Sequence, residues 1–177
     1  MKKKLLCLLL TVAMTAFVTS CVVDSSPQKE SGNNSSTESA VSKASKEETF
    51  GLNDTAVFEN LKFTATEITE SKGTEFFSPD SGKVFVGVKF TIENVSDQDQ
   101  NVSSLMLFNG YVDDVKCEYS FNAACAFDEG TLDGTVAPGK KLVGWYALEV
   151  PENWSVIDLE VKSDWLSNSS AKFVFKK

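Results

Sequence analysis

The chain has 177 residues, of which 42% are hydrophobic and 24% charged, and its formal net charge is −8. It contains no histidine, and all 17 of its basic residues are lysines, which excludes histidine-based triads, histidine metal ligands and bidentate arginine clamps. The acidic balance argues against binding to nucleic acid, because like charges repel.

Residues 1–20 have the pattern of a signal peptide. Three lysines precede an apolar run from Leu5 to Val18, which has 14 residues and is shorter than the roughly 20 needed to span a bilayer. The next residues, Val18-Thr19-Ser20-Cys21, resemble the lipobox of bacterial lipoproteins, in which an aliphatic and two small residues precede a cysteine. The alternative is an ordinary secreted protein with a chance cysteine.

The lipobox resemblance implies that cleavage leaves Cys21 as the first mature residue, bearing a lipid. Three lysines leave with the signal peptide, so the mature chain has 14 basic and 25 acidic residues and a charge of −11. Two acyl chains, each contributing about 0.8 kcal/mol per buried methylene, anchor the protein without a polybasic patch. We therefore expect a protein attached to the extracytoplasmic face of the cell membrane.

Residues 21–49 are expected to form a disordered tether. From Asp24 to Thr49 the chain is rich in Ser, Asn, Lys and Glu, has no aromatic residue, and has Val41 as its only large aliphatic residue. Such a segment cannot bury enough apolar surface to offset the entropy lost on ordering. As a flexible coil it spans roughly 30 Å.

Residues 50–177 have the composition of one folded domain, with 12 of the 13 phenylalanines and all three tryptophans. A segment of this size can bury a core. Every second residue is apolar in 84–92, which is typical of a strand with one buried face. Similar alternation predicts strands over residues 61–65, 115–121, 142–150, 157–161 and 173–175.

Turn residues separate these segments, among them Asn109-Gly110 and Pro138-Gly139. Pro138 at the first and Gly139 at the second central position suit a type II turn. Asn94 can end its strand by bonding the backbone two residues on. No segment has a convincing 3.6-residue period, and seven or more short antiparallel strands predict an all-β sandwich. A closed barrel is the alternative, because strand pattern alone does not separate the two folds.

Four stretches of the domain carry a second resemblance. They are residues 82–94 (GKVFVGVKFTIEN), the turn at 109–111, residues 136–140 with 144–146, and residues 149–151. In their order and spacing they resemble the bacterial domain-of-unknown-function family numbered 4352, an immunoglobulin-like sandwich of the immunoprotective-extracellular type. The resemblance covers roughly residues 50–177. It implies an immunoglobulin-like antiparallel β-sandwich behind a lipoprotein signal, and no catalytic residues.

Two cysteines remain after Cys7 leaves with the signal peptide and Cys21 takes the lipid. Cys117 and Cys125 both have apolar neighbours, and outside the cytoplasm they can form a disulfide. Closing so small a loop would stabilise the fold by roughly 2 to 3 kcal/mol. The alternative is two buried thiols that pack as small hydrophobes. No Cys-x-x-Cys motif indicates a thiol oxidoreductase.

Acidic clusters raise the alternative of a calcium site. Residues 97–101 (DQDQN) begin like an EF-hand loop, but Val102 stands where glycine is needed and Phe108 where a bidentate glutamate is needed. Further carboxylates occur at 113–114, at 128–129 and at Asp133. Solvated loops are the expected state of these residues, so no metal ion and no cofactor is predicted.

Trp154 and Trp165 flank turns and are the candidate residues for an exposed patch that binds protein or carbohydrate. The alternative is that these rings close the ends of the core.

Three function classes follow. A lipid-anchored module that binds an unknown envelope protein or glycan, without catalysis, is favoured. A hydrolase with paired carboxylates, for instance Asp113 with Asp128, is the alternative, but no spacing predicts a shared pocket. A transporter solute-binding subunit is disfavoured, because that class usually closes two α/β lobes around its ligand.

Overall fold

The computed structural model describes residues 28–30, 48–128, 130–166 and 169–177. Its elements are β1 (Gln28–Glu30), β2 (Thr49–Phe50), β3 (Thr55–Val57), β4 (Leu61–Ser71), β5 (Lys83–Asn94), β6 (Gln100–Val102), α1 (Ser104–Leu107), β7 (Phe108–Val112), β8 (Val115–Cys117), α2 (Phe121–Ala124), β9 (Gly134–Val136), β10 (Lys141–Pro151), β11 (Val156–Val161) and β12 (Ala171–Lys176). The predicted signal peptide, Cys21 and most of the predicted tether lie outside the described residues. Within the described ranges, no helix has both the length and the apolar character that a membrane crossing requires.

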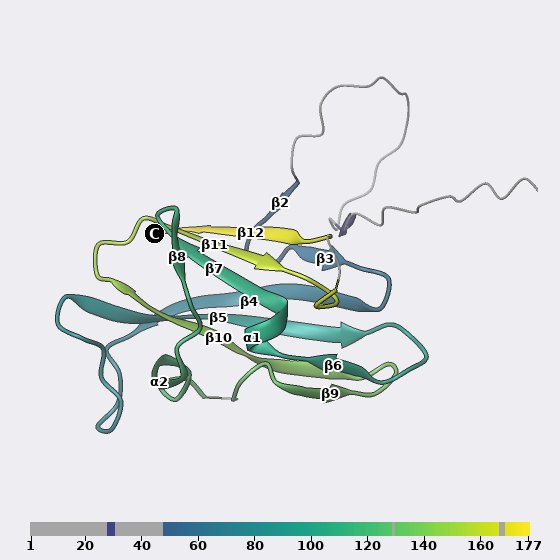
Figure 1. Cartoon of the computed structure of the whole chain (residues 1–177), viewed down its shortest axis with the longest axis horizontal. Helices are drawn as coiled ribbons and strands as arrows, with labels where there is room; N and C mark the ends of the chain where they lie inside the picture. The colour runs from purple at the N-terminus through teal and green to yellow at the C-terminus, as the bar shows by residue number, and fades with distance from the viewer. Residues whose placement is uncertain (1–27, 31–47, 129, 167–168) are drawn as a thin grey trace, which may run out of the picture.

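Two five-stranded sheets form the body of the domain (Figure 1). The first has the strand order β1-β3-β4-β5-β10, and the second has the order β2-β12-β11-β7-β8. The predicted all-β sandwich is confirmed, and the closed barrel is not formed. One pairing differs from the expected antiparallel pattern, because β2 runs parallel to β12. β6 and β9 form a separate two-stranded sheet.

The core lies between the two sheets, as the alternation in β5 predicts. Val84, Val86, Val88, Phe90 and Ile92 are buried in the main cluster. Each fully buried side chain of this size contributes about 1.5 to 3 kcal/mol relative to an exposed one. Aromatic rings from the second sheet meet this row and join the two layers.

The outer face of the first sheet is also covered, which the sequence analysis did not predict. Phe85 and Ala147 point away from the main core and pack with Ala123 and Ala124 of α2. Nearby, the Phe127 ring stacks on Trp145 with ring centroids 5.1 Å apart. The middle of β5 and β10 is therefore buried on both faces.

The predicted strand over 115–121 is wrong beyond its third residue. β8 ends at Cys117, and Phe121 begins α2 with its side chain 66% exposed. The Ser120 hydroxyl accepts a hydrogen bond from the Ala123 N–H, which is the N-cap contact that favours a helix start. A helix of four residues is too short to produce a recognisable 3.6-residue period.

The predicted turn at Asn109-Gly110 is also wrong, because both residues lie inside β7. The chain turns instead at Asp113 and Asp114, whose φ values of 48° and 66° are both positive. Two positive φ values are what a two-residue type I′ hairpin turn requires, and aspartate tolerates this conformation better than most residues.

The Asn94 stop and the Pro138-Gly139 turn are confirmed. The Asn94 Oδ1 accepts the Ser96 N–H at 2.9 Å, two residues on. Gly139 has a φ of 68°, and the Lys140 N–H donates to the Ala137 carbonyl, closing the turn. Together they fix the exit of β5 next to the entry of β10.

Short segments occupy the edges of both sheets. β10 is bridged along its edge by Tyr119 opposite Leu148 and by Thr131 opposite Trp145. The other edge of the first sheet is the three-residue β1, which pairs with β3 although it lies inside the predicted tether. Backbone pairing does not depend on apolar side chains, so composition gave no sign of this strand. The second sheet ends in β2 and β8, with two and three residues.

Candidate functional site

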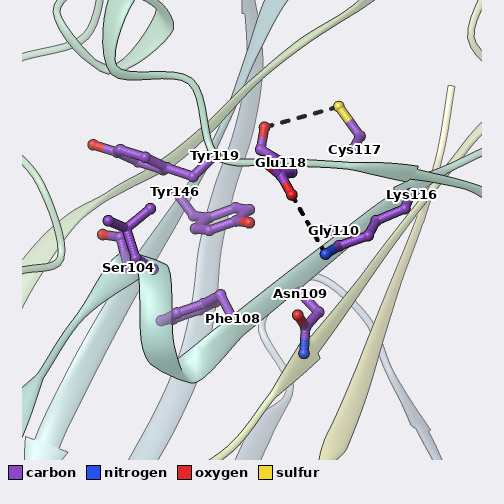
Figure 2. A pocket seen from close by; sticks show the side chains of 10 residues that line it. Ser104, Phe108, Asn109, Gly110, Lys116, Cys117, Glu118, Tyr119 and Tyr146 are labelled. Atoms are coloured by element: carbon purple, nitrogen blue, oxygen red, sulfur yellow. Dashed lines mark hydrogen bonds and ion pairs between the residues drawn. The ribbon is translucent and has the colours of Figure 1, made fainter.

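A pocket of about 220 Å³ opens beside α1, where β7, β8 and β10 come together (Figure 2). The polar residues that line it are Ser104, Asn109, Lys116, Cys117, Glu118, Tyr119 and Tyr146. Leu105, at the start of α1, lies on the rim with its side chain largely exposed. The pocket joins residues that are up to 42 positions apart in the sequence, Ser104 and Tyr146.

The pocket exists because β8 leaves its partner strand. β7 and β8 pair only as far as Gly110 opposite Cys117, and the chain then crosses to the first sheet, where Tyr119 bridges Leu148. On the β8 side of β7, no strand therefore lies beside Asn109, and the pocket opens there.

Gly110 allows the close packing at the base of this pocket. A Cβ atom at Gly110 would lie 2.7 Å from the Cys117 carbonyl oxygen and 3.5 Å from the Tyr146 hydroxyl oxygen. Any larger residue would have to displace the β8 backbone. Glycine is needed at position 110 because the β8 backbone approaches it closely, and not because the chain turns there.

The two tyrosines present neutral hydroxyl groups. Burial raises the pKa of Tyr146 well above its usual range, and the charges of neighbouring groups add to this effect. Burial, followed by the nearby Asp133 carboxylate, raises the pKa of Tyr119 to about 12. Both phenols therefore stay protonated at neutral pH. The Tyr119 hydroxyl is buried and points away from Lys116 and Glu118 (Figure 2), so the Tyr146 hydroxyl is the one that faces these charged groups.

The charged groups at the pocket are paired. Lys116 Nζ lies 3.4 Å from a Glu118 carboxylate oxygen, across the pocket mouth in Figure 2. Both side chains are exposed, so this ion pair contributes little to stability. It does place one positive and one negative group where an incoming ligand would meet them.

Cys117 lies on the wall as a protonated thiol. Burial raises its pKa, and its Sγ lies 3.6 Å from the Glu149 carbonyl oxygen, to which it donates. A thiol with a raised pKa is a poor nucleophile. We therefore assign Cys117 a packing role in the pocket lining and not that of a nucleophile.

The structure holds Cys117 and Cys125 as free thiols, without the disulfide that was one of the two alternatives. Cys117 belongs to β8, whereas Cys125 caps the C-terminal end of α2 over the other sheet. Cys125 is also exposed, so the alternative of two buried thiols does not describe it.

The predicted carboxylate pair is not a shared site. Asp113 is in the β7–β8 turn, where its carboxylate accepts hydrogen bonds from the Ser155 and Val156 N–H groups. Asp128 follows α2, on the outer face of the opposite sheet. The Ser104 hydroxyl does donate to an Asp133 carboxylate oxygen at 3.0 Å, and Ser104 is fully buried.

The part of the chain that the structure describes contains no candidate calcium site. No group of three or more Asp, Glu, Cys or His side chains there is arranged to hold a metal ion. Gln100 and Asn101 of the EF-hand-like segment belong to β6 and pair with β9. The Asp133 carboxylate accepts the backbone N–H of Ser104, a first-turn N–H of α1 that has no partner within the helix.

Trp154 and Trp165 do not form one patch, because they lie at opposite ends of β11. Trp154 is only 4% exposed, and its indole N–H donates to Glu70 Oε1 at 2.7 Å. This ring closes one end of the core, as the alternative interpretation predicts. Trp165 is 61% exposed, and its neighbour Leu166 is 68% exposed.

Lys177 contacts both Glu70 and Trp154 at this end of the core. Lys177 Nζ lies 2.7 Å from Glu70 Oε1 and 5.3 Å from the centre of the Trp154 ring. The hydrogen bond from Lys177 lowers the pKa of Glu70, with a smaller contribution from the Trp154 indole. Burial acts in the opposite direction but is outweighed.

This contact predicts a pH-dependent contribution to stability. A carboxyl group with a lowered pKa in the folded state stabilises the fold above its unfolded pKa of about 4.3 and loses that effect as the pH falls through the folded pKa. We expect Lys177→Met to lower the free energy of unfolding by about 0.5 kcal/mol at pH 6, a value kept small because both groups are partly exposed. At pH 3 the difference from wild type should shrink, as urea unfolding at both pH values would measure. Lys176→Met is the matched control, and an equal loss at both pH values would contradict the assignment.

Residues 50–172 match the model of the family described as a domain of unknown function, DUF4352. The chain belongs to the DUF4352 family. The resemblance found in the sequence is thereby confirmed for the domain. No curated protein matches the chain significantly by sequence.

Solved structures share the fold of this DUF4352 domain. A candidate lipoprotein of Bacillus subtilis, ycdA, superposes with a TM-score of 0.56 at 15% identity over 67% of this chain. That match spans only 37% of the Bacillus protein. An uncharacterised β-sandwich protein of Clostridium difficile has a TM-score of 0.51 at 17% identity, over 78% of this chain and 99% of its own. The secreted protein MPT63 of Mycobacterium tuberculosis has a TM-score of 0.51 at 9% identity, over 76% and 100%.

The pocket of this DUF4352 domain was missed by the sequence analysis. The sequence predicts only a strand over residues 142–150, which contain Tyr146, and a turn at Asn109-Gly110. A signal was present in Phe108, Gly110 and Val112, which alternate with polar residues as a strand does. A glycine inside such a strand indicates a close approach of another backbone.

Proposed function

We propose that this protein is a lipid-anchored extracytoplasmic module that binds an envelope partner and does not catalyse a reaction. The observation that carries the proposal is the order of the chain, in which a lipobox-like segment ending at Cys21 precedes a DUF4352 sandwich. The fold neighbours support the location, since one is described as a lipoprotein candidate and another as a secreted protein.

The pocket beside α1 is the proposed contact site. The neutral hydroxyl of Tyr146 and the ion pair between Lys116 and Glu118 can orient a polar group through hydrogen bonds. The exposed Leu105 on the rim adds apolar surface that a partner would cover. This combination suits a small polar ligand or a polar side chain of a partner protein.

The lipid anchor is tested by intact-mass analysis and fractionation of native-host cells. The wild type should yield a mature chain that begins at a lipid-modified Cys21 and stays with the membranes. Cys21→Ala should be unprocessed, or released from the membrane, because no thiol is left to take the diacylglycerol.

Cys7→Ala is the matched control, because Cys7 lies in the proposed signal peptide and should be absent from the mature chain. This variant should have the mature mass and membrane location of the wild type. Recovery of the wild type as an unlipidated, secreted chain would refute the anchor and leave a soluble sandwich.

A further inference from the structure

The loop between β11 and β12 presents two large apolar side chains to solvent. Trp165 and Leu166 are adjacent and mostly exposed, whereas the other two tryptophans, Trp145 and Trp154, are buried. Single exposed apolar residues are ordinary, but an exposed indole beside an exposed leucine is the kind of surface that a partner covers. Neither side chain belongs to the pocket beside α1.

This loop lies at the end of the sandwich where the described chain begins. β11 starts near Trp154, which binds Glu70 close to the end of β4, so the loop after Val161 lies at the opposite end. β4 begins at that opposite end, next to β3. The first residue of β1, Gln28, is paired with Val57, the last residue of β3. Figure 1 shows β1 and the loop that precedes β12 on the same side of the molecule.

The covalent distance from this end to the proposed anchor is short. Seven peptide steps separate Cys21 from Gln28, and even a fully extended chain of that length spans at most about 25 Å. A lipid on Cys21 would therefore hold the start of β1, and the Trp165 end with it, close to the headgroups.

We propose that Trp165 and Leu166 insert into the interfacial layer of the same bilayer that holds Cys21, so that the domain docks on its own membrane. Tryptophan is enriched at this depth because its ring is apolar and its N–H is polar. The inference rests on the proposed lipid anchor and extends it with a second contact.

Charge selects the lipid surface. The mature chain has a net charge of −11, and Asp164, whose carboxylate accepts the Leu166 N–H, lies beside the apolar pair. Lys162 balances Asp164 within the loop, so the repulsion from anionic headgroups comes from the net charge of the whole mature chain. The proposed surface is therefore zwitterionic, and docking should weaken as anionic lipid is added.

The test uses the full protein, purified from membranes with its lipid confirmed by mass and reconstituted into phosphatidylcholine vesicles that carry brominated acyl chains. Bromine quenches nearby indoles, and Trp165 is the exposed tryptophan. We expect loss of most of the Trp165 emission in these vesicles. Trp165→Phe should remove the quenchable emission, whereas Trp154→Phe should retain it if the variant unfolds cooperatively.

Each outcome separates the two proposals. Lipidated protein whose Trp165 emission is not quenched would overturn the docking and leave the anchor standing. A wild type without lipid would overturn the anchor itself, as the mass shows before any vesicle is made. A third outcome would point to a second copy of the protein. In it, bromine does not quench Trp165, but Trp165 becomes less accessible to aqueous iodide as more protein is placed on each vesicle. That result would overturn the membrane contact.

Discussion

Replacing Phe90 with alanine should lower the free energy of unfolding by about 4 kcal/mol. Phe90 is fully buried in β5, and its ring meets Phe108 and Phe173 of the other sheet at centroid distances of 5.4 and 5.2 Å. Both contacts are T-shaped, the arrangement that aromatic pairs favour. Alanine would leave a cavity between the two layers that the rigid sheets cannot close.

Urea unfolding of the purified protein measures this loss, and thermal unfolding should show a decrease in Tm of more than about 10 °C. Phe76→Ala is the matched control, because Phe76 lies in the β4–β5 loop with its side chain 83% exposed. It should change stability by less than about 0.5 kcal/mol. Similar losses for the two variants would mean that Phe90 does not join the sheets as described.

Asn94→Ala should lower the free energy of unfolding by about 3 kcal/mol, because it leaves buried polar groups without partners. Asn94 is fully buried at the end of β5. Its Nδ2 donates to the Val136 and Gln98 carbonyl oxygens, both at 2.7 Å, and its Oδ1 accepts from the N–H and the hydroxyl of Ser96. One side chain therefore ties β5 to the β5–β6 loop and to β9.

Asn94→Asp separates the donors from the acceptor. A carboxylate keeps the bonds from Ser96 but points an oxygen at two carbonyl oxygens, so it should destabilise the protein as much as alanine does. Ser96→Ala should lower the free energy of unfolding by about 1 kcal/mol or less, since the backbone N–H of residue 96 can still donate to Asn94 Oδ1. Urea unfolding of the three variants measures the order, and an aspartate variant as stable as wild type would contradict the assigned donor contacts.

The sandwich could be predicted because its main strands have a local signal. In β5 and β10 the side chains that face the main core recur at every second residue, so a short window of sequence reveals the buried face. The strand end at Asn94 and the Pro138-Gly139 turn could be interpreted for the same reason, since the bond from Ser96 N–H to Asn94 Oδ1 and the bond that closes the turn each join residues no more than three positions apart.

The candidate site could not be predicted, because distant residues create it. The pocket depends on where β8 leaves β7, and that departure is set by the bridge between Tyr119 and Leu148 in the other sheet. α2 was missed because its partner, Phe85, has no local relation to it. Phe85 nevertheless gave a hint, since a large apolar residue on the supposedly polar face of a strand requires a cover.

The short edge strands of both sheets have a consequence for behaviour at high density. A long unpaired strand is a template on which other molecules can build intermolecular sheet, the first step of aggregation. In the described part of the chain the outermost strands β1, β2 and β8 have two or three residues each, and β10 is bridged by Tyr119 and Thr131. Many copies crowded on one surface would therefore find little backbone to pair with on these strands. Within the described residues an intermolecular sheet would start instead on the part of β4 after Ala65, which pairs with β5 but not with β3.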